Sequence, residues 1–182
     1  MNPFSRFNPR RLRVMATAFL VLAVGTALAR DDAALPARVQ VTWGPTETLS
    51  EVKDNPLQRG WLRPEDWMKS LGDYLRTRGD VVLPAGEQLQ VTIDDIKLAG
   101  DFEPWHSSAA QDIRFLTDLH PPRINLHYKL LAGDGSTIRE GNGKLRDLSY
   151  LQRTVPTSTD PLRYDKRLIG DWLRKEFARK QS

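Results

Sequence analysis

Residues 124–145 read INLHYKLLAGDGSTIREGNGKL and contain the clearest structural signal of the chain. Apolar and polar residues alternate over residues 124–130, which is the period of a strand with one buried face. The Gly-Asp-Gly of residues 133–135 suits a turn, and a returning strand follows over residues 138–145. The stretch therefore predicts an antiparallel β-hairpin, the most strongly indicated unit of the fold.

Two more strands are indicated on the N-terminal side of this hairpin. Residues 39–43 alternate and predict a first strand, and residues 89–98 predict a second. One extra residue near Asp94-Asp95 interrupts the second alternation, as a β-bulge does. Residues 44–63 contain scattered Gly, Pro and polar residues, which predicts a long connection rather than an element. Residues 112–119 fit either a short strand or a helical turn.

Two amphipathic helices complete the predicted fold. The first begins at Pro64 and ends at Arg78, just before Gly79. The second is capped by Asp160 and opened by Pro161, and basic residues suit its negative end. Each helix has an apolar stripe that needs a sheet to cover. The stripes are Trp67, Met68, Leu71, Tyr74 and Leu75 in the first helix, and Leu162, Ile169, Trp172, Leu173 and Phe177 in the second.

The order strand, helix, strand, hairpin, helix predicts an α+β fold. We expect a mainly antiparallel sheet of about four to five strands, with both helices packed on one face. One domain would span residues 38–182, after a flexible lead-in at residues 30–37. The opposite face of the sheet, or an edge strand, then stays available for contacts.

The first 29 residues are typical of a secretory signal peptide. Four arginines precede an uncharged, mostly apolar run at residues 14–28, and Ala27-Leu28-Ala29 is a small-x-small cleavage motif. As a helix the run would be about 22 Å long, whereas the hydrocarbon core of a bilayer is about 30 Å thick. We therefore expect export by the general secretory route and cleavage after Ala29, rather than a retained membrane anchor. The mature protein would be periplasmic, without a membrane span.

The formal charge of the chain is +4, and the four arginines of the leader account for all of it. Residues 30–182 therefore contain equal numbers of basic and acidic residues, which leaves nonspecific nucleic-acid binding without a driving force. The chain has no cysteine, which excludes disulfides, thiol catalysis and lipid attachment at a cysteine. No nucleic-acid partner is expected.

Established catalytic motifs are absent from the sequence. It contains no phosphate-binding loop, no Gly-x-Ser-x-Gly elbow, no His-Glu-x-x-His and no dinucleotide fingerprint. We accordingly expect no cofactor and no metal. Of the three histidines, His127 is expected to be a polar residue on the solvent side of its strand, and His120 fits a turn before Pro121-Pro122. His106 alone lies beside other polar residues.

The candidate site is the connection over residues 100–112. In one interpretation its aromatic rings offer a flat apolar face to a sugar or peptide, while its carboxylates accept hydrogen bonds. In a second, the carboxylates and histidine bind a divalent metal or perform acid–base catalysis. In a third, the rings pin the loop to the core and the acids keep its rim solvated. The candidate residues are Asp101, Phe102, Glu103, Trp105 and His106.

Trp61 is a further candidate, because it lies in the long connection over residues 44–63 and could serve as an exposed anchor. Trp43, Trp67 and Trp172 fit the apolar stripes and are expected in the core instead.

Several short runs together resemble one bacterial family, the domain of unknown function 3016. They are residues 98–105 (LAGDFEPW), 121–124 (PPRI), 144–148 (KLRDL), 160–164 (DPLRY) and 171–173 (DWL). The resemblance covers nearly all of the chain after residue 29, and it implies an exported proteobacterial protein with no assigned activity.

Taken together, these features predict a non-enzymatic periplasmic module that binds an envelope protein or a glycan or peptide ligand. The alternative is a carboxylate-dependent hydrolase of envelope glycan or peptidoglycan, or a metal-binding protein. Asp101 and Glu103 would carry either of these activities.

Overall fold

The computed structural model describes residues 37–55, 62–103, 105, 113–153 and 158–178. Residues 1–36, which include the expected leader, lie outside this part. The elements in chain order are β1 Val39–Trp43, the 3-10 turn η1 Thr46–Thr48, α1 Ser50–Asp54, α2 Pro64–Val82, β2 Gln88–Lys97, β3 Asp101–Phe102, β4 Arg114–Phe115, β5 Arg123–Leu131, β6 Thr137–Arg146 and α3 Arg163–Phe177.

Four strands form the main sheet, in the order β1-β2-β5-β6. β2, β5 and β6 are antiparallel neighbours, and the predicted hairpin is confirmed as β5 and β6. β1 instead pairs in parallel with β2, in the register Val39 with Leu89. Because parallel neighbours need a crossover connection, α2 lies between these two strands in the chain. The expected α+β fold is confirmed.

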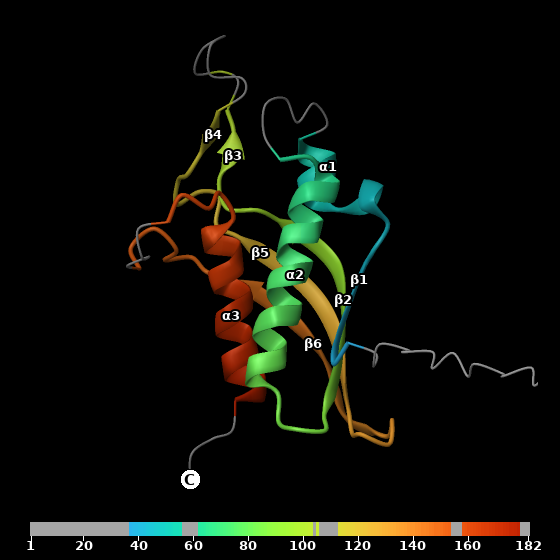
Figure 1. Cartoon of the computed structure of the whole chain (residues 1–182). Helices are drawn as coiled ribbons and strands as arrows, with labels where there is room; N and C mark the ends of the chain where they lie inside the picture. The colour runs from blue at the N-terminus through green and yellow to red at the C-terminus, as the bar shows by residue number, and fades with distance from the viewer. Residues whose placement is uncertain (1–36, 56–61, 104, 106–112, 154–157, 179–182) are drawn as a thin grey trace, which may run out of the picture. The chain divides into compact units, whose positions relative to one another are not determined.

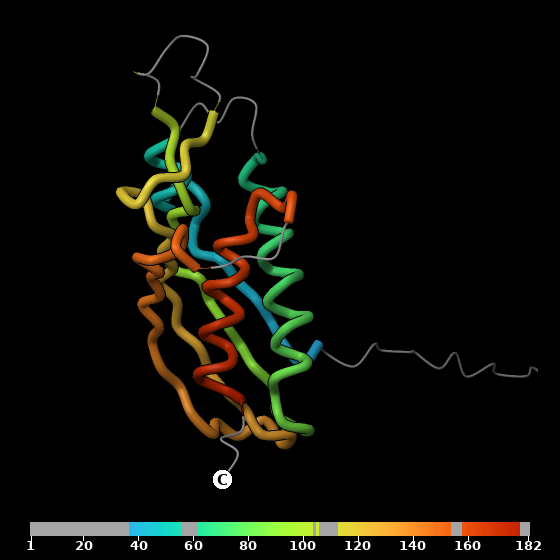
Figure 2. The backbone as a smooth tube through the Cα atoms, turned by 90° about the vertical axis from the view of Figure 1, so that its left-hand side faces the viewer, coloured from blue at the N-terminus to red at the C-terminus, as the bar shows by residue number. Residues whose placement is uncertain are grey.

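Both long helices lie side by side on one face of the sheet, as Figures 1 and 2 show. Their apolar stripes meet the inward-facing residues of all four strands, and these form one buried core. Trp67 of α2 is fully buried and lies edge-on to Trp43 of β1, with ring centroids 5.7 Å apart. Trp172 of α3 packs in the same way against Tyr128 of β5.

The predicted end of α2 is wrong by four residues, because the helix continues through Gly79 to Val82. A glycine at position 79 is typical of a helix end. Here its missing side chain instead allows the helix to pack closely against β1. A Cβ atom at this position would lie 2.9 Å from Cγ2 of Val39. The second helix begins at Arg163, two residues later than predicted, and Asp160 Oδ1 accepts a hydrogen bond from the Leu162 amide at 2.9 Å.

The predicted bulge in β2 is confirmed by a register shift between Ile93 and Asp95. The bulge turns the Asp95 carboxylate towards α1, where it accepts hydrogen bonds from the Ser50 amide at 2.7 Å and the Ser50 hydroxyl at 2.9 Å. These bonds cap the N-terminus of a helix in a region predicted to be only a connection. That prediction is wrong because the cap comes from another element.

The face of the sheet away from the helices is polar. Thr42 and Thr92 share a hydrogen bond of 2.7 Å across β1 and β2. His127 is exposed, as expected, with its Nδ1 2.9 Å from Oδ1 of Asp94. Within the described ranges, no helix is long and apolar enough to cross a bilayer.

Candidate functional site

β3 and β4 form a short antiparallel ribbon at one end of the main sheet, close to α1 (Figure 1). Asp101 and Phe102 are the two residues of β3, and Glu103 follows directly. Trp105 lies in the connection from β3 to β4. His106 and Trp61, the other two candidates, lie outside the described residues. Four of the six predicted site residues can therefore be placed, and all four belong to this ribbon.

The base of the ribbon is held by a buried ion pair between Glu51 of α1 and Arg114 of β4. Arg114 donates to both carboxylate oxygens of Glu51, at 2.7 and 3.0 Å. The Arg114 side chain is only 5% exposed and the Glu51 side chain only 2%. Glu51 also accepts from the Leu98 amide at 3.0 Å and from Asn55 Nδ2 at 3.1 Å. This bidentate geometry is the strong form of a carboxylate–guanidinium contact.

Arg114 also bonds to the backbone where β2 leads into β3. It donates to three successive carbonyls in this segment, and its guanidinium lies 5.3 Å from the ring centroid of Phe102. The carbonyls are those of Leu98 at 3.1 Å, Ala99 at 2.8 Å and Gly100 at 2.9 Å. One side chain thereby satisfies three backbone acceptors that lie beyond the end of β2.

Asp165 of α3 reaches the same segment from the helix layer. Its Oδ1 accepts a hydrogen bond from the Ala99 amide at 3.0 Å, and the residue is almost completely buried. Desolvation by burial raises the pKa of Asp165 to about 7, although the Ala99 amide and Arg114 both act to lower it. Asp165 Oδ2 has no hydrogen-bond partner among the described residues.

The two predicted carboxylates already contact basic side chains within the protein. Lys97 is buried, with its Nζ 3.1 Å from Asp54 and 3.3 Å from Asp101. His120 brings the two candidates together, because its Nε2 lies 3.4 Å from Glu103 and its Nδ1 lies 3.8 Å from Asp101. The His120 carbonyl also accepts a hydrogen bond from the Gly100 amide at 2.8 Å, which fits the turn role expected for it.

The two aromatic candidates differ in their surroundings. Phe102 is half-buried beneath the Arg114 guanidinium. Trp105 is 72% exposed. Within the described ranges, no cluster of three or more His, Asp or Glu side chains could hold a metal ion. The arrangement therefore fixes the ribbon by charge pairing and presents an indole ring to solvent.

Sequence reasoning missed the residues that hold this ribbon, namely Glu51, Lys97, Arg114 and Asp165. Their partners lie far away in the chain, and the Glu51–Arg114 pair spans 63 residues. Asp165 alone has a visible signal, because it lies three residues before Leu168 and four before Ile169 on the buried face of α3. An acidic residue on an apolar stripe indicates a buried polar contact.

Gly100 provides a test of how tightly the ribbon is held. Its φ of +78° lies in the left-handed region, and a Cβ atom would lie 2.4 Å from the carbonyl oxygen of Phe115. We expect Gly100→Ala to lower the free energy of unfolding by about 2–3 kcal/mol, from backbone strain and overpacking together. Urea denaturation would measure the loss.

Gly135 is the matched control for this substitution. It has a similar φ of +84°, but a Cβ atom there would meet nothing within 4 Å. Gly135→Ala should therefore cost only about 1 kcal/mol, which is the strain contribution alone. Equal losses in the two variants would contradict a tightly packed ribbon base.

Comparison with known proteins gives one positive result. No curated protein and no solved structure shows significant similarity to this chain. One family model matches residues 37–175, which include every described strand and nearly all of α3. The resemblance carried by the short runs of sequence is thus confirmed. The chain belongs to the family described as Protein of unknown function (DUF3016).

Proposed function

We propose that this protein is a non-enzymatic binding module of the cell envelope that works in the periplasm. Its contact region is the connection between β3 and β4, where Trp105 lies. The periplasmic location is supported by the leader-like residues 1–29, with their arginines, apolar run and small-x-small motif.

The observation that carries the proposal is an exposed indole on an anchored ribbon. Trp105 is 72% exposed, whereas the base of the ribbon is held by the buried Glu51–Arg114 pair. Tryptophan is enriched among the residues that dominate binding energy at interfaces, and it also offers a flat face to sugar rings. A ring presented from a fixed base loses little conformational entropy on binding.

The surroundings of the two carboxylates favour binding over hydrolysis. Glycoside hydrolysis needs two carboxyl groups that flank the substrate bond. Here Asp101 contacts Lys97 and accepts a hydrogen bond from the Phe102 amide, while Glu103 is buried beside His120. Their contacts support a role in shaping the ribbon that carries Trp105.

Substitution of Trp105 tests the proposal. With a photo-crosslinking residue at position 105, we expect the full-length chain, expressed with its leader in a proteobacterial host, to capture an envelope component. The purified component, or soluble peptidoglycan fragments, would then be titrated against wild type and Trp105→Ala. We expect at least tenfold weaker binding by the variant, with an unchanged urea midpoint.

Val81 is the matched control, because it is also a large exposed apolar side chain, at 71%. It lies in the last turn of α2, and this end of the helix is far from β3 and β4 in Figure 1. Val81→Ala should leave affinity unchanged. Equal binding by wild type and Trp105→Ala would remove the site. Turnover of peptidoglycan fragments that Asp101→Asn or Glu103→Gln abolishes would instead establish the hydrolase.

A further inference from the structure

β6 forms one edge of the main sheet. It spans ten residues and, in the described sheet, has β5 as its neighbour on one side and no strand on the other. A strand in this position presents backbone amides and carbonyls along its outer edge, to which an extended segment of another protein can pair. Proteins often cover or shorten such edges, so a long edge raises the question of what pairs with it.

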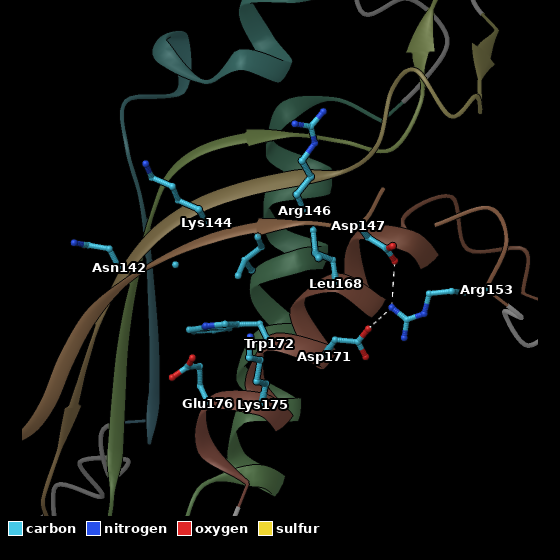
Figure 3. A pocket seen from close by; sticks show the side chains of 12 residues that line it. Asn142, Lys144, Arg146, Asp147, Arg153, Leu168, Asp171, Trp172, Lys175 and Glu176 are labelled. Atoms are coloured by element: carbon cyan, nitrogen blue, oxygen red, sulfur yellow. Dashed lines mark hydrogen bonds and ion pairs between the residues drawn. The ribbon is translucent and has the colours of Figure 1, made fainter. Parts of the chain in front are cut away.

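A groove of about 400 Å³ lies between β6 and α3 (Figure 3). Its lining includes Gly143 and Leu145 on the inward side of β6, and Leu168 and Trp172 of α3. A Cβ atom at Gly143 would lie 3.0 Å from Cδ1 of Leu126, so even a small side chain would crowd the sheet there.

The acidic residues that line this groove are paired. Asp147 and Asp171 both contact Arg153, at 3.3 and 2.7 Å, and the dashed lines of Figure 3 show this bridge. Glu176 lies 3.6 Å from Arg139, which also donates to the Glu176 carbonyl at 2.7 Å.

Three cations of the groove lining have no such partner. The side chains of Lys144, Arg146 and Lys175 make no ion pair or hydrogen bond with any other described residue. Arg146 also lies directly opposite Arg123 of β5, with both side chains exposed. Like charges directly opposite each other on a sheet are destabilising. The positive charge at this edge is therefore uncompensated.

We propose that an acidic, extended segment of a partner protein adds to the β6 edge as a fifth strand. Alternate side chains of an added strand point to opposite faces. Its acidic residues would meet Lys144 and Arg146 on the exposed face, and small side chains between them would enter the groove beside Lys175. This partner surface is separate from Trp105.

A second copy of the chain fits this edge less well than an acidic segment. The β6 strand of a second copy would bring another Lys144 and Arg146 to this edge. The same two side chains already lack an acidic partner there, so the two strands would repel each other. Charged side chains on an edge usually discourage pairing with a like strand. The same charges favour a strand of opposite sign.

The experiment uses a blocked ten-residue peptide of alternating Glu and Thr, titrated into the isotopically labelled protein and followed by NMR. We expect shifts confined to β6 and the facing side of α3, together with slower hydrogen exchange at outward β6 amides. The paired substitution Lys144→Gln with Arg146→Gln should weaken peptide binding at least tenfold. It should also raise stability slightly, because it relieves the contact with Arg123.

The control is the double variant Lys53→Gln with Arg78→Gln. It also removes one lysine and one arginine, and neither of these side chains forms an ion pair with another described residue. If the control variant binds the peptide with an affinity within twofold of wild type, the result supports a site at β6. The proposal is overturned by equal weakening in both double variants, by no β6 shift at millimolar peptide, or by unchanged amide exchange. It is also overturned if polyphosphate binds as tightly as the peptide, or if β6 pairs with a second copy.

Discussion

Replacing Arg114 with methionine should lower the free energy of unfolding by about 3–5 kcal/mol, because it leaves the Glu51 carboxylate buried without its counter-charge. Arg114→Met also removes the donor to the carbonyls of Leu98, Ala99 and Gly100. Methionine fills similar space, so the loss reflects charge and hydrogen bonding more than a cavity. Urea denaturation measures the change in unfolding free energy.

Arg63→Met is the matched control for this prediction. Arg63 also forms ion pairs, with Glu65 at 3.2 Å and Asp66 at 3.1 Å, but its side chain is 69% exposed. Exposed pairs contribute about 0–1 kcal/mol, so the control should unfold close to wild type. If Arg114→Met lost no more stability than Arg63→Met, the Glu51–Arg114 pair would not anchor the ribbon.

Replacing Asp165 with asparagine should change how stability depends on pH. Burial raises the pKa of Asp165 from 3.8 to about 7 in the folded protein. Between these values the folded state holds a proton that the unfolded state has released, so rising pH destabilises the fold. Above about pH 7 the group is ionised in both states and the full cost is present. A shift of this size corresponds to about 4 kcal/mol.

The measurement is the unfolding free energy of wild type and Asp165→Asn from pH 4 to pH 8. As pH rises we expect the wild type to lose stability relative to Asp165→Asn, and this loss to level off above about pH 7. Asparagine keeps an acceptor for the Ala99 amide but cannot ionise. Parallel stability curves for the two proteins over this range would contradict a raised pKa.

Asp160→Asn serves as the control of opposite sign. Partial burial acts to raise the Asp160 pKa, but hydrogen bonds from Lys166 and the Leu162 amide lower it overall. The stability that Asp160 contributes is therefore present above its unfolded pKa of 3.8 and is lost as pH falls through its folded pKa. Between pH 5 and pH 8 the Asp160→Asn difference should be constant.

The elements with local signals could be predicted from the sequence. β5 and β6 follow from alternation around Gly-Asp-Gly, and the bulge of β2 follows from one interrupted period. The two long helices follow from their apolar stripes and from prolines near their starts. In each case, residues within one turn or one strand carry the information.

The elements determined by distant contacts could not be predicted. α1 depends on a cap from Asp95, which is 45 residues away from Ser50. Gly79 is conformationally suited to end a helix, and only the position of Val39 explains why a glycine lies inside the helix instead. The parallel pairing of β1 with β2 likewise has no local signal.

The geometry around the candidate residues could not be predicted from the sequence, for the same reason. The loop composition indicated Asp101, Glu103 and Trp105, because carboxylates and an indole between two strands suggest binding chemistry. Their geometry depends on Lys97 and His120, and a single sequence does not reveal these pairings. The His120 contacts become visible only after β3 and the segment between β4 and β5 are placed next to each other.

The parallel β1–β2 pair also bears on how fast the parts of the sheet can form. Thr42 and Thr92 are 50 residues apart, so the first strand to leave the ribosome has no ladder partner until much more of the polypeptide is made. The β5–β6 hairpin needs only a short loop, which closes at a far lower entropic cost. We therefore expect the β5–β6 hairpin to form faster than the β1–β2 pair when the unfolded chain folds.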